Sequence, residues 1–409
     1  MQTELRTTCD LAQITVAAHI AGETRRKLVN LLAKRGAFTS CLDSSGVHNA
    51  QKCERVLRVF AIATAAHPFE NYLERVTMRV MRLTRHSLIP AALLAAALGP
   101  ASALDLKGHR GARGLAPENT LPAFALALGI GITTLELDIA ITRDDVLVIS
   151  HDPALDPDIT RGPDGEFLKT RGPVIRELAY AELQRYDVGR LKPGTPYALR
   201  YPQQQAIDGA RIPRLADLFE LVRKSDNDKV RFAIETKVSP LNAHESVAPA
   251  AFARAVVAAI REAGMADRST ILSFDWRTLA VVQKEAPEIG TVYLSAQQPF
   301  LDNIGAGKPQ GSAWTNGIRF EDHGSVARMI RAAGGRTWSA FHGDLDAATV
   351  KEAKALGLQV LAWTVNGPRE IARVLDLGVD GIVSDRPDVV RQEMQRRGLA
   401  LPPITPVQP

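Results

Sequence analysis

From residue 104 onward, short apolar runs rich in Val, Ile and Leu alternate with stretches of helical periodicity. Runs such as VLVIS (146–150) and VLAW (360–363) lack polar alternation, which is typical of strands covered on both faces in a parallel sheet. The predicted strands are Leu106–His109, Thr134–Ile139, Val146–Ser150, Val230–Glu235, Thr270–Phe274, Thr291–Leu294, Gln359–Thr364 and Gly381–Ser384, with Thr337–Ser339 as a ninth candidate. Eight β-then-α units favour a (β/α)₈ TIM barrel over an open doubly wound sheet.

Between these runs, apolar residues recur with the period of an amphipathic helix. The predicted helices are Leu121–Leu128, Ala248–Ala263, Arg277–Lys284, Ser325–Ala333, Ala347–Ala355 and Arg369–Leu375. Glycines follow several of them closely, as expected of residues that end helices. We therefore predict that the barrel spans residues 104–395.

One connection departs from the alternation of strands and helices: residues 152–229 form a long stretch rich in Pro, Gly, Arg and Asp. Within it, Arg176–Tyr186 and Leu215–Arg223 have helical patterns. A connection this long inside a compact barrel is usually functional, so we predict a small insertion over the barrel mouth, between the third and fourth strands. The chain ends in LPPITPVQP, with four prolines in nine residues, and we expect residues 396–409 to be disordered.

The charge of the chain is unevenly distributed, which argues against a nucleic-acid partner. Hydrophobic residues make up 45 % and charged residues 23 % of the 409 residues, an ordinary globular composition. Residues 1–103 contain 13 Lys and Arg against 7 Asp and Glu, whereas residues 104–409 contain 37 against 38. The formal net charge of +5 therefore comes from the first quarter of the chain, and the predicted barrel has no basic excess to attract a polyanion.

Residues 78–103 have the pattern of a secretory signal peptide. The arginines Arg79, Arg82 and Arg85 precede an apolar stretch, Leu88–Leu98, and Ala101-Ser102-Ala103 supplies small residues for cleavage. The apolar stretch is shorter than the roughly 20 residues that span a bilayer. We therefore expect no stable membrane insertion once the signal has been removed.

A secretory signal normally begins a chain, so its position here predicts that translation starts at Met78 or Met81. Residues 1–77 are then an upstream extension and not a native domain. The alternatives are a small amino-terminal module before an internal apolar segment, and a buried Ala/Leu helix in place of the signal. All three cysteines precede residue 104, which suits an oxidising compartment. We predict a periplasmic or secreted protein.

Acidic, basic and histidine side chains gather where four successive predicted strands end, and TIM barrels carry their active sites at that edge. The set comprises His109, Arg110, Glu136, Asp138, His151, Glu235 and Lys237. Residues two apart in a strand share a face, so Glu136 and Asp138 point the same way, as do Glu235 and Lys237. Two histidines, three carboxylates and two cations are therefore expected at one mouth.

Three converging carboxylates repel one another unless a positive charge lies between them. Oxygen ligands favour a hard cation such as Ca²⁺ or Mg²⁺ over zinc, which favours His and Cys. Arg110 and Lys237 then remain to bind an anion, and a histidine pair can act as base and acid near neutral pH. This combination predicts phosphodiester cleavage.

Five sequence motifs, in order, resemble those of the glycerophosphodiester phosphodiesterases. They are GHRGARGLAPENTLPAF (108–124), ELDIAITRDDVLVISHDP (136–153), IETK (234–237), WTVN (363–366) and GIVSDRPD (381–388). The resemblance spans about residues 107–390. It implies hydrolysis of a small-molecule glycerophosphodiester to glycerol 3-phosphate and an alcohol such as choline or ethanolamine.

The resemblance also implies roles for individual residues. The catalytic histidines of the family fall on His109 and His151, one as base and one as acid. Its metal carboxylates fall on Glu136, Asp138 and Glu235. Its phosphate-contacting cations fall on Arg110 and Lys237, and an aromatic wall of the substrate pocket falls on Trp363. Similarity to exported members makes Ca²⁺ the first choice of metal and Mg²⁺ the second. The order of the histidines, a cyclic intermediate and the oligomeric state are left open.

Two other functions compete with this interpretation. A lysophospholipase D or sphingomyelinase-D-like lipid phosphodiesterase would be favoured by a wide apolar rim on the 152–229 insertion, but that stretch is mostly polar. A non-catalytic glycerophosphodiester-binding module would be expected to lack a histidine or a metal acid, and none is missing.

Several neighbours of the set have structural interpretations. Asn119 or Thr120 is predicted to cap the helix that starts at Leu121. Asp152 either orients His151 or caps the following turn. Three aromatic residues near later strand ends are predicted to pack, with lining of the mouth as the alternative: Phe274, Trp314 and Trp338.

Overall fold

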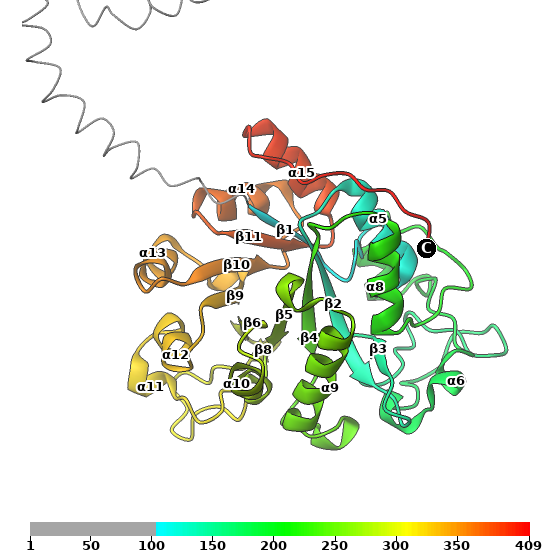
Figure 1. Cartoon of the computed structure of the whole chain (residues 1–409), viewed down its shortest axis with the longest axis horizontal. Coiled ribbons are helices and arrows are strands. Elements are labelled where there is room, and N and C mark those ends of the chain that lie inside the picture. Colours follow the sequence, from blue (N-terminus) through cyan, green and yellow to red (C-terminus); the bar gives the residue numbers. More distant parts are fainter. Residues whose placement is uncertain (1–103) are drawn as a thin grey trace, which may run out of the picture. The chain divides into compact units, whose positions relative to one another are not determined.

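The structure, a computed structural model, describes residues 104–409 (Figure 1). The predicted upstream extension (1–77) and signal peptide (78–103) lie outside the described residues. Among the helices of residues 104–409, none combines the length and the apolar character that crossing a bilayer requires.

Eight parallel strands close into a barrel with helices around it, which confirms the predicted TIM-barrel architecture (Figure 1). The barrel strands are β1 (Asp105–Gly108), β2 (Thr134–Ile141), β4 (Arg231–Thr236), β5 (Ser269–Ser273), β6 (Gly290–Ser295), β9 (Thr337–Phe341), β10 (Gln359–Trp363) and β11 (Gly381–Ser384). The barrel is closed by β1, which pairs with β11 on one side and with β2 on the other. Because all eight strands run in one direction, their carboxyl ends meet at a single mouth.

A helix follows each barrel strand in the chain. These helices are α5 (Leu121–Ile130), α8 (Leu215–Lys224), α9 (Pro249–Glu262), α10 (Trp276–Glu285), α12 (Val326–Ala332), α13 (Ala347–Ala355), α14 (Pro368–Asp376) and α15 (Pro387–Arg396). Shorter elements are η1 (Ile175–Glu177), α6 (Tyr180–Leu183), α7 (Pro196–Arg200), η2 (Ala243–Glu245), η3 (Ala266–Arg268), β7 (Gln297–Gln298), β8 (Leu301–Asp302), α11 (Phe320–His323) and η4 (His342–Asp344). Proline stands in the first turn of α5, α9, α14 and α15, where its fixed φ suits the helix.

The apolar run at 146–150 is not a barrel strand, and this part of the prediction was wrong. Its strand β3 (Leu147–Ile149) pairs antiparallel with β2 through the turn at 142–146, whereas the ninth candidate became the barrel strand β9. The run lacks polar alternation because the insertion covers it with a second apolar cluster that includes Val148, Leu155 and Ile175. The insertion therefore lies between the second and third barrel strands, not between the third and fourth.

Packing inside the barrel differs from packing around it. Outside, Phe219 of α8 meets Phe232 of β4 with ring centroids 4.9 Å apart. The interior holds a smaller cluster, made of Ala233, Leu272, Val292, Leu294 and Leu361. Phe274 and Trp363 pack against this cluster at the ends of β5 and β10. The mouth is therefore apolar near β5 and β10, and charged near β1, β2 and β4.

The end of the chain, predicted to be disordered, instead follows a defined path beside α5 (Figure 1). Residues 397–409 form no helix or strand, which agrees with their four prolines. The Thr405 N–H nevertheless donates to the Leu128 carbonyl at 3.0 Å, and its hydroxyl accepts from Asn227 at 3.0 Å. Arg391 of α15 donates to the Pro402 carbonyl at 2.7 Å. Proline removes donors, but the remaining backbone groups hold the tail.

The loop after β1 depends on one glycine. Gly111 has φ +88°, and a Cβ there would lie 2.7 Å from the carbonyl carbon of Ala123 in α5. We expect Gly111→Ala to lower the free energy of unfolding by about 1–3 kcal/mol, because the backbone must strain or α5 must move. A Cβ atom at Gly129, within α5, would have no other atom within 4 Å. Gly129→Ala should therefore stabilise the protein by about 0.5–1 kcal/mol. Denaturant unfolding measures both changes, and equal stability of the two variants would contradict the argument.

Candidate active site

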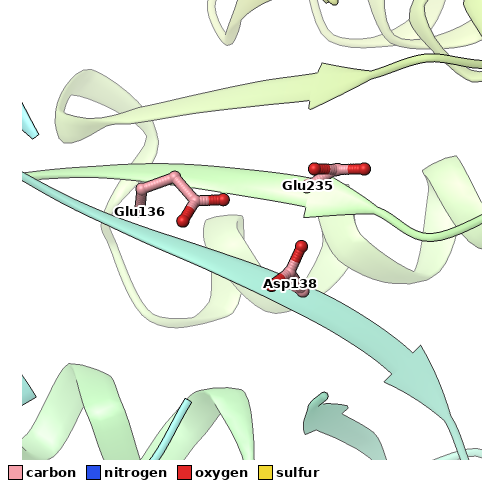
Figure 2. A group of neighbouring side chains, drawn as sticks. All are labelled: Glu136, Asp138 and Glu235. Carbon is pink, nitrogen blue, oxygen red and sulfur yellow. The ribbon is translucent and has the colours of Figure 1, made fainter. Parts of the chain in front are cut away.

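Three buried carboxylates meet on two adjacent strands at the charged side of the mouth. Figure 2 shows Glu136 and Asp138 on β2 and Glu235 on the neighbouring β4. Asp138 stands opposite Glu235 in the β2–β4 ladder, and one oxygen from each of the three acids lies within 4.8 Å of the others. The predicted alternation of side chains along β2 therefore places Glu136 and Asp138 together, as expected.

The cluster consists of three acids and no cation, and their mutual repulsion and burial shift their pKa values. Burial, together with Asp138 and Glu235, raises the pKa of Glu136 well above its usual range. Burial also raises the pKa of Glu235, although Lys237 opposes that shift. Burial opposes ionisation of Asp138 as well, but Arg110, His151 and Lys237 hold the pKa of Asp138 far below its usual range. Burial and neighbouring acids therefore disfavour the charged form of Glu136, whereas neighbouring cations favour the charged form of Asp138.

The donor set fits a hard divalent cation. The Asp138 side chain is 1 % exposed, and its Oδ1 atom has no hydrogen-bond partner among residues 104–409. A buried carboxylate oxygen without a partner is costly unless a cation satisfies it. Three carboxylates provide the oxygen ligands that such cations prefer. The cluster of Glu136, Asp138 and Glu235 can therefore bind a divalent metal ion.

Each predicted catalytic histidine is held by an acidic partner. His109 follows β1, and its Nδ1 lies 2.6 Å from Asp385 Oδ1, while its Nε2 lies 3.9 Å from Glu136. His151 follows β3, and its Nδ1 lies 2.8 Å from Asp152 Oδ1. Of the two interpretations of Asp152, the contact supports orientation of His151.

Burial and Arg113 lower the pKa of His109 to about 4, although Asp385 opposes the shift. His109 is therefore neutral at pH 7. Burial opposes ionisation of Asp385, yet His109 and Arg113 hold the pKa of this carboxyl well below its usual range. An ionised carboxylate only accepts hydrogen bonds, so Nδ1 of His109 carries the proton and its Nε2 has a free lone pair.

The two predicted phosphate-binding cations are engaged with acids. Arg110 donates to Glu118 at 2.6 Å, and its Nε lies 3.3 Å from Asp138. Lys237 donates to Glu235 at 2.8 Å and lies 3.7 Å from Asp138. Both cations thus offset the negative charge of the acidic cluster.

One cavity of about 220 Å³ brings these groups together. It is lined by His109, Arg110, Glu136, His151, Glu235, Lys237 and Trp363, which are all of the predicted site residues except Asp138. Arg200 of α7 also lines it, so the insertion reaches the mouth. Trp363 is fixed by a hydrogen bond from its Nε1 to the Ser339 carbonyl at 3.0 Å.

Sequence reasoning missed a network behind His109. Asp385 accepts from Arg113 Nε at 2.8 Å and from Asn366 Nδ2 at 2.7 Å, and its own N–H donates to Asn366 Oδ1 at 2.9 Å. WTVN and GIVSDRPD contain Asn366 and Asp385, but the motifs alone assigned them no role. The pairing of β1 with β11 brings Asp385 beside His109.

Asn119 also has a role that differs from the expected cap. Thr120 alone caps α5, accepting from the Ala123 N–H at 3.4 Å. Asn119 has φ +56° and donates instead to Asp138 Oδ2 at 2.9 Å. Backbone strain at an asparagine beside a buried acid is typical of functional sites, and a positive φ has no signature in the sequence.

A second cavity of about 380 Å³ adjoins the first. The two share His151, Glu235, Lys237, Phe274 and Trp363 as lining residues. Phe274 and Trp314 both line the second cavity. For these two residues the alternative prediction, lining of the mouth, is therefore the correct one. Trp338 is buried and donates to Ser295 at 2.8 Å, so it packs as predicted.

Comparison with known proteins places this site in a family. Residues 109–389 match the Glycerophosphoryl diester phosphodiesterase family. A glycerophosphodiester phosphodiesterase of Caldanaerobacter subterraneus subsp. tengcongensis is 26 % identical over 292 residues, covering 71 % of this chain and 97 % of the relative.

Solved structures agree in fold. A Silicibacter pomeroyi structure, provisionally named a glycerophosphoryl diester phosphodiesterase, has a TM-score of 0.65 and 35 % identity, covering 74 % of this chain and 96 % of its own. An Oleispira antarctica phosphodiesterase, solved with the product sn-glycerol-3-phosphate, shares the fold at a TM-score of 0.52 and 23 % identity, covering 72 % and 97 %. Because the family match covers well over half of the chain and every residue of the site, this protein belongs to the glycerophosphoryl diester phosphodiesterase family and is a phosphodiester-hydrolysing enzyme.

Proposed function

We propose that the enzyme hydrolyses glycerophosphodiesters to sn-glycerol 3-phosphate and a free alcohol, with a divalent metal and with His109 and His151 as base and acid. The observation that carries the proposal is the single cavity lined by both histidines and by two of the three clustered acids. A substrate phosphate in this cavity would lie beside Arg110 and Lys237, whose charges favour an anion.

His109 is the proposed base. Its pKa is lowered to about 4, so it is unprotonated at neutral pH, and Asp385 keeps the proton on Nδ1. Nε2 can then take a proton from the attacking oxygen. Asp385 is fixed in turn by Arg113 and Asn366, which limits rotation of the imidazole.

His151 is the proposed acid. It lines both cavities, whereas His109 lines only the first, so His151 stands nearer to a leaving group in the second cavity. Asp152 contacts its Nδ1, and hydrogen bonding to His151 helps to lower the pKa of Asp152 to about 2 against the effect of burial. An ionised Asp152 stabilises the protonated imidazole that must donate a proton to the departing alcohol.

Glu136, Asp138 and Glu235 would hold the metal. A bound divalent ion would neutralise the acids and supply Lewis-acid stabilisation of negative charge on the phosphate. We propose Ca²⁺ first and Mg²⁺ second, because both prefer carboxylate oxygens. The residues of the chain then orient the substrate and move its protons.

A glycerol 3-phosphate release assay with glycerophosphocholine tests the proposal. We expect turnover with Ca²⁺ or Mg²⁺, loss of turnover after chelation, and recovery when the metal is restored. Turnover that a chelator leaves unchanged would refute the metal requirement, and absence of glycerol 3-phosphate among the products would refute the reaction.

Asp385→Asn should lower kcat by about 10²-fold, because a misplaced base costs about that much in rate. Since Asp385 raises the pKa of His109, its loss should also move the acidic limb of the kcat/KM profile to lower pH. A purely structural defect would reduce activity without moving that limb. Arg386→Gln in the next position is a control, because Arg386 pairs with Asp388 outside this network.

Lysophospholipid hydrolysis is a second candidate, favoured by one observation. Phe300 lines the second cavity and is 64 % exposed, so an acyl chain could contact it. The insertion contributes only Leu199 and Ile207 to the exposed large apolar residues, which is not a wide apolar rim. Parallel assays with glycerophosphocholine and lysophosphatidylcholine decide between the two substrates.

We also propose that the enzyme is periplasmic or secreted. The pattern of residues 78–103 and the absence of cysteine from residues 104–409 support export. Sequencing of the native amino terminus provides the test: Leu104 as the first residue agrees with cleavage after Ala103, whereas an intact Met1 contradicts it.

A further inference from the structure

The insertion contributes one charged residue, Arg200, to the first cavity. Arg200 is the last residue of α7, is exposed, and lines the cavity together with His109 and Lys237. A cavity of about 220 Å³ is smaller across than the distance over which salt screens a charge, about 8 Å at physiological ionic strength. The charge of Arg200 therefore acts on any phosphoryl group that occupies the cavity.

Two tyrosines hold α7 against the loop that follows β1. Tyr197 donates to Glu118 and accepts from Arg113 at 3.3 Å. The Tyr201 ring lies against the Arg113 guanidinium, with Cζ 4.9 Å from the ring centroid. Residues three apart share one side of a helix, so Arg200 lies on the same side of α7 as Tyr197. Docking of this single turn therefore directs Arg200 toward the cavity that it lines.

Arg200 differs from the other Arg and Lys residues of the cavity because no carboxylate offsets its charge. The other three each donate to a buried carboxylate at 2.6–2.8 Å: Arg110 to Glu118, Arg113 to Asp385 and Lys237 to Glu235. Within residues 104–409, Arg200 forms no ion pair. A cation that is already paired attracts an added anion less strongly than an unpaired one does. An anionic ligand in this cavity therefore meets the full charge of Arg200.

We infer that Arg200 binds the phosphoryl group of the ligand, and that its unpaired charge favours glycerol 3-phosphate over the uncleaved diester. The inference rests on the proposed function and deepens it, because it makes the insertion a determinant of product inhibition. A phosphate monoester has a second pKa of about 6 and is a dianion at pH 8, whereas a diester has one negative charge. Arg200 attracts the dianion more strongly and therefore retains the product.

Two ligands of nearly equal size separate charge from shape. Glyceryl methylphosphonate has a methyl group in place of one phosphate oxygen of glycerol 3-phosphate, so at pH 8 it has one negative charge and not two. In Arg200→Gln, we expect Ki to rise about ninefold for glycerol 3-phosphate and about threefold for the methylphosphonate, because losing an exposed ion pair costs about threefold for each ligand charge. Competitive inhibition of glycerophosphocholine hydrolysis measures both constants, and KM for this diester should rise about threefold.

Two further variants control for charge and for position. Arg200→Lys keeps the charge, so Ki should stay within about twofold of the wild type for both ligands. Arg185→Gln is the matched control, because Arg185 is an exposed arginine of the same insertion that lines neither cavity. Equal losses of affinity for both ligands in Arg200→Gln would make the residue structural and overturn the inference. Losses in Arg200→Lys as large as those in Arg200→Gln would overturn it as well.

The outcomes distinguish this inference from the function on which it rests. If the wild type hydrolyses glycerophosphocholine and Arg200→Gln has the Ki values of the wild type, only the inference fails. If the wild type with metal releases no glycerol 3-phosphate, the proposed function fails. Thermal unfolding still measures ligand binding in that case, because a ligand of the folded state raises Tm. An increase in Tm with glycerol 3-phosphate that is equal in the wild type and Arg200→Gln would exclude Arg200 from phosphoryl binding.

Discussion

His109→Ala and His151→Ala are each expected to reduce kcat by about 10²–10⁴-fold, the usual contribution of a positioned acid or base. Loss of His109 removes the neutral imidazole whose Nε2 faces Glu136, and loss of His151 removes the ring shared by the two cavities. The two variants should differ in their response to the leaving group. A better leaving group, such as p-nitrophenol, needs no proton and should restore much of the rate to His151→Ala but not to His109→Ala.

Release of glycerol 3-phosphate, or of p-nitrophenol from the activated ester, measures both effects. His323→Ala is the matched control, because His323 lies at the end of α11 and lines neither of these cavities. Recovery of His109→Ala, and not His151→Ala, with the activated ester would reverse the proposed roles. Wild-type kcat in either variant would remove that histidine from the mechanism.

Glu136→Gln is expected to abolish the response to metal and to lower activity by about 10³-fold, because Lewis-acid stabilisation contributes several kcal/mol. Its fold should remain intact. Burial and the neighbouring acids raise the pKa of Glu136 and so disfavour its charged form, and a neutral glutamine of the same shape avoids that cost. Asp138→Asn should behave differently, since Asp138 is ionised among Arg110, His151 and Lys237, and its loss leaves buried cations unpaired.

Thermal unfolding with and without Ca²⁺ tests this prediction without relying on turnover. Metal should raise the Tm of the wild-type protein and leave that of Glu136→Gln unchanged. A metal ion competes with a proton for Glu136, whose pKa is raised, so metal affinity of the wild type should rise with pH below the pKa of that group. A Ca²⁺-dependent rise in the Tm of Glu136→Gln equal to that of the wild type would exclude Glu136 as a ligand.

Much of the site could be predicted because it depends on local geometry. The alternation of side chains along a strand places Glu136 and Asp138 on one face whatever the rest of the fold does. Likewise, Lys237 follows Glu235 by two positions and reaches it at 2.8 Å. The resemblance to a known family then implied which of these groups are catalytic histidines, metal ligands and phosphate-contacting cations.

The error at residues 146–150 has a different origin. A continuous apolar run indicates that both faces of a strand are buried, but it does not indicate what buries them. Here the insertion covers β3, which pairs with β2 as a hairpin and stays outside the barrel. Parallel and antiparallel partners impose the same demand for apolar side chains on a strand that is covered on both faces.

Periodicity along the chain was sufficient to predict alternating strands and helices with a charged carboxyl-end mouth, and the two-residue spacing placed Glu136 beside Asp138. Glu235 joins these two acids only through the pairing of β2 with β4. The acidic partner of His109 could not be predicted in this way. Asp385 follows β11, 276 residues after His109 in the chain, and it reaches His109 only because β11 pairs with β1 when the barrel closes. The same holds for the tail, whose prolines forbid regular structure while Leu128 and Asn227 provide its hydrogen-bond partners. Closure of the barrel and docking of distant segments bury these groups, and burial turns ordinary polar residues into oriented, pKa-shifted ones.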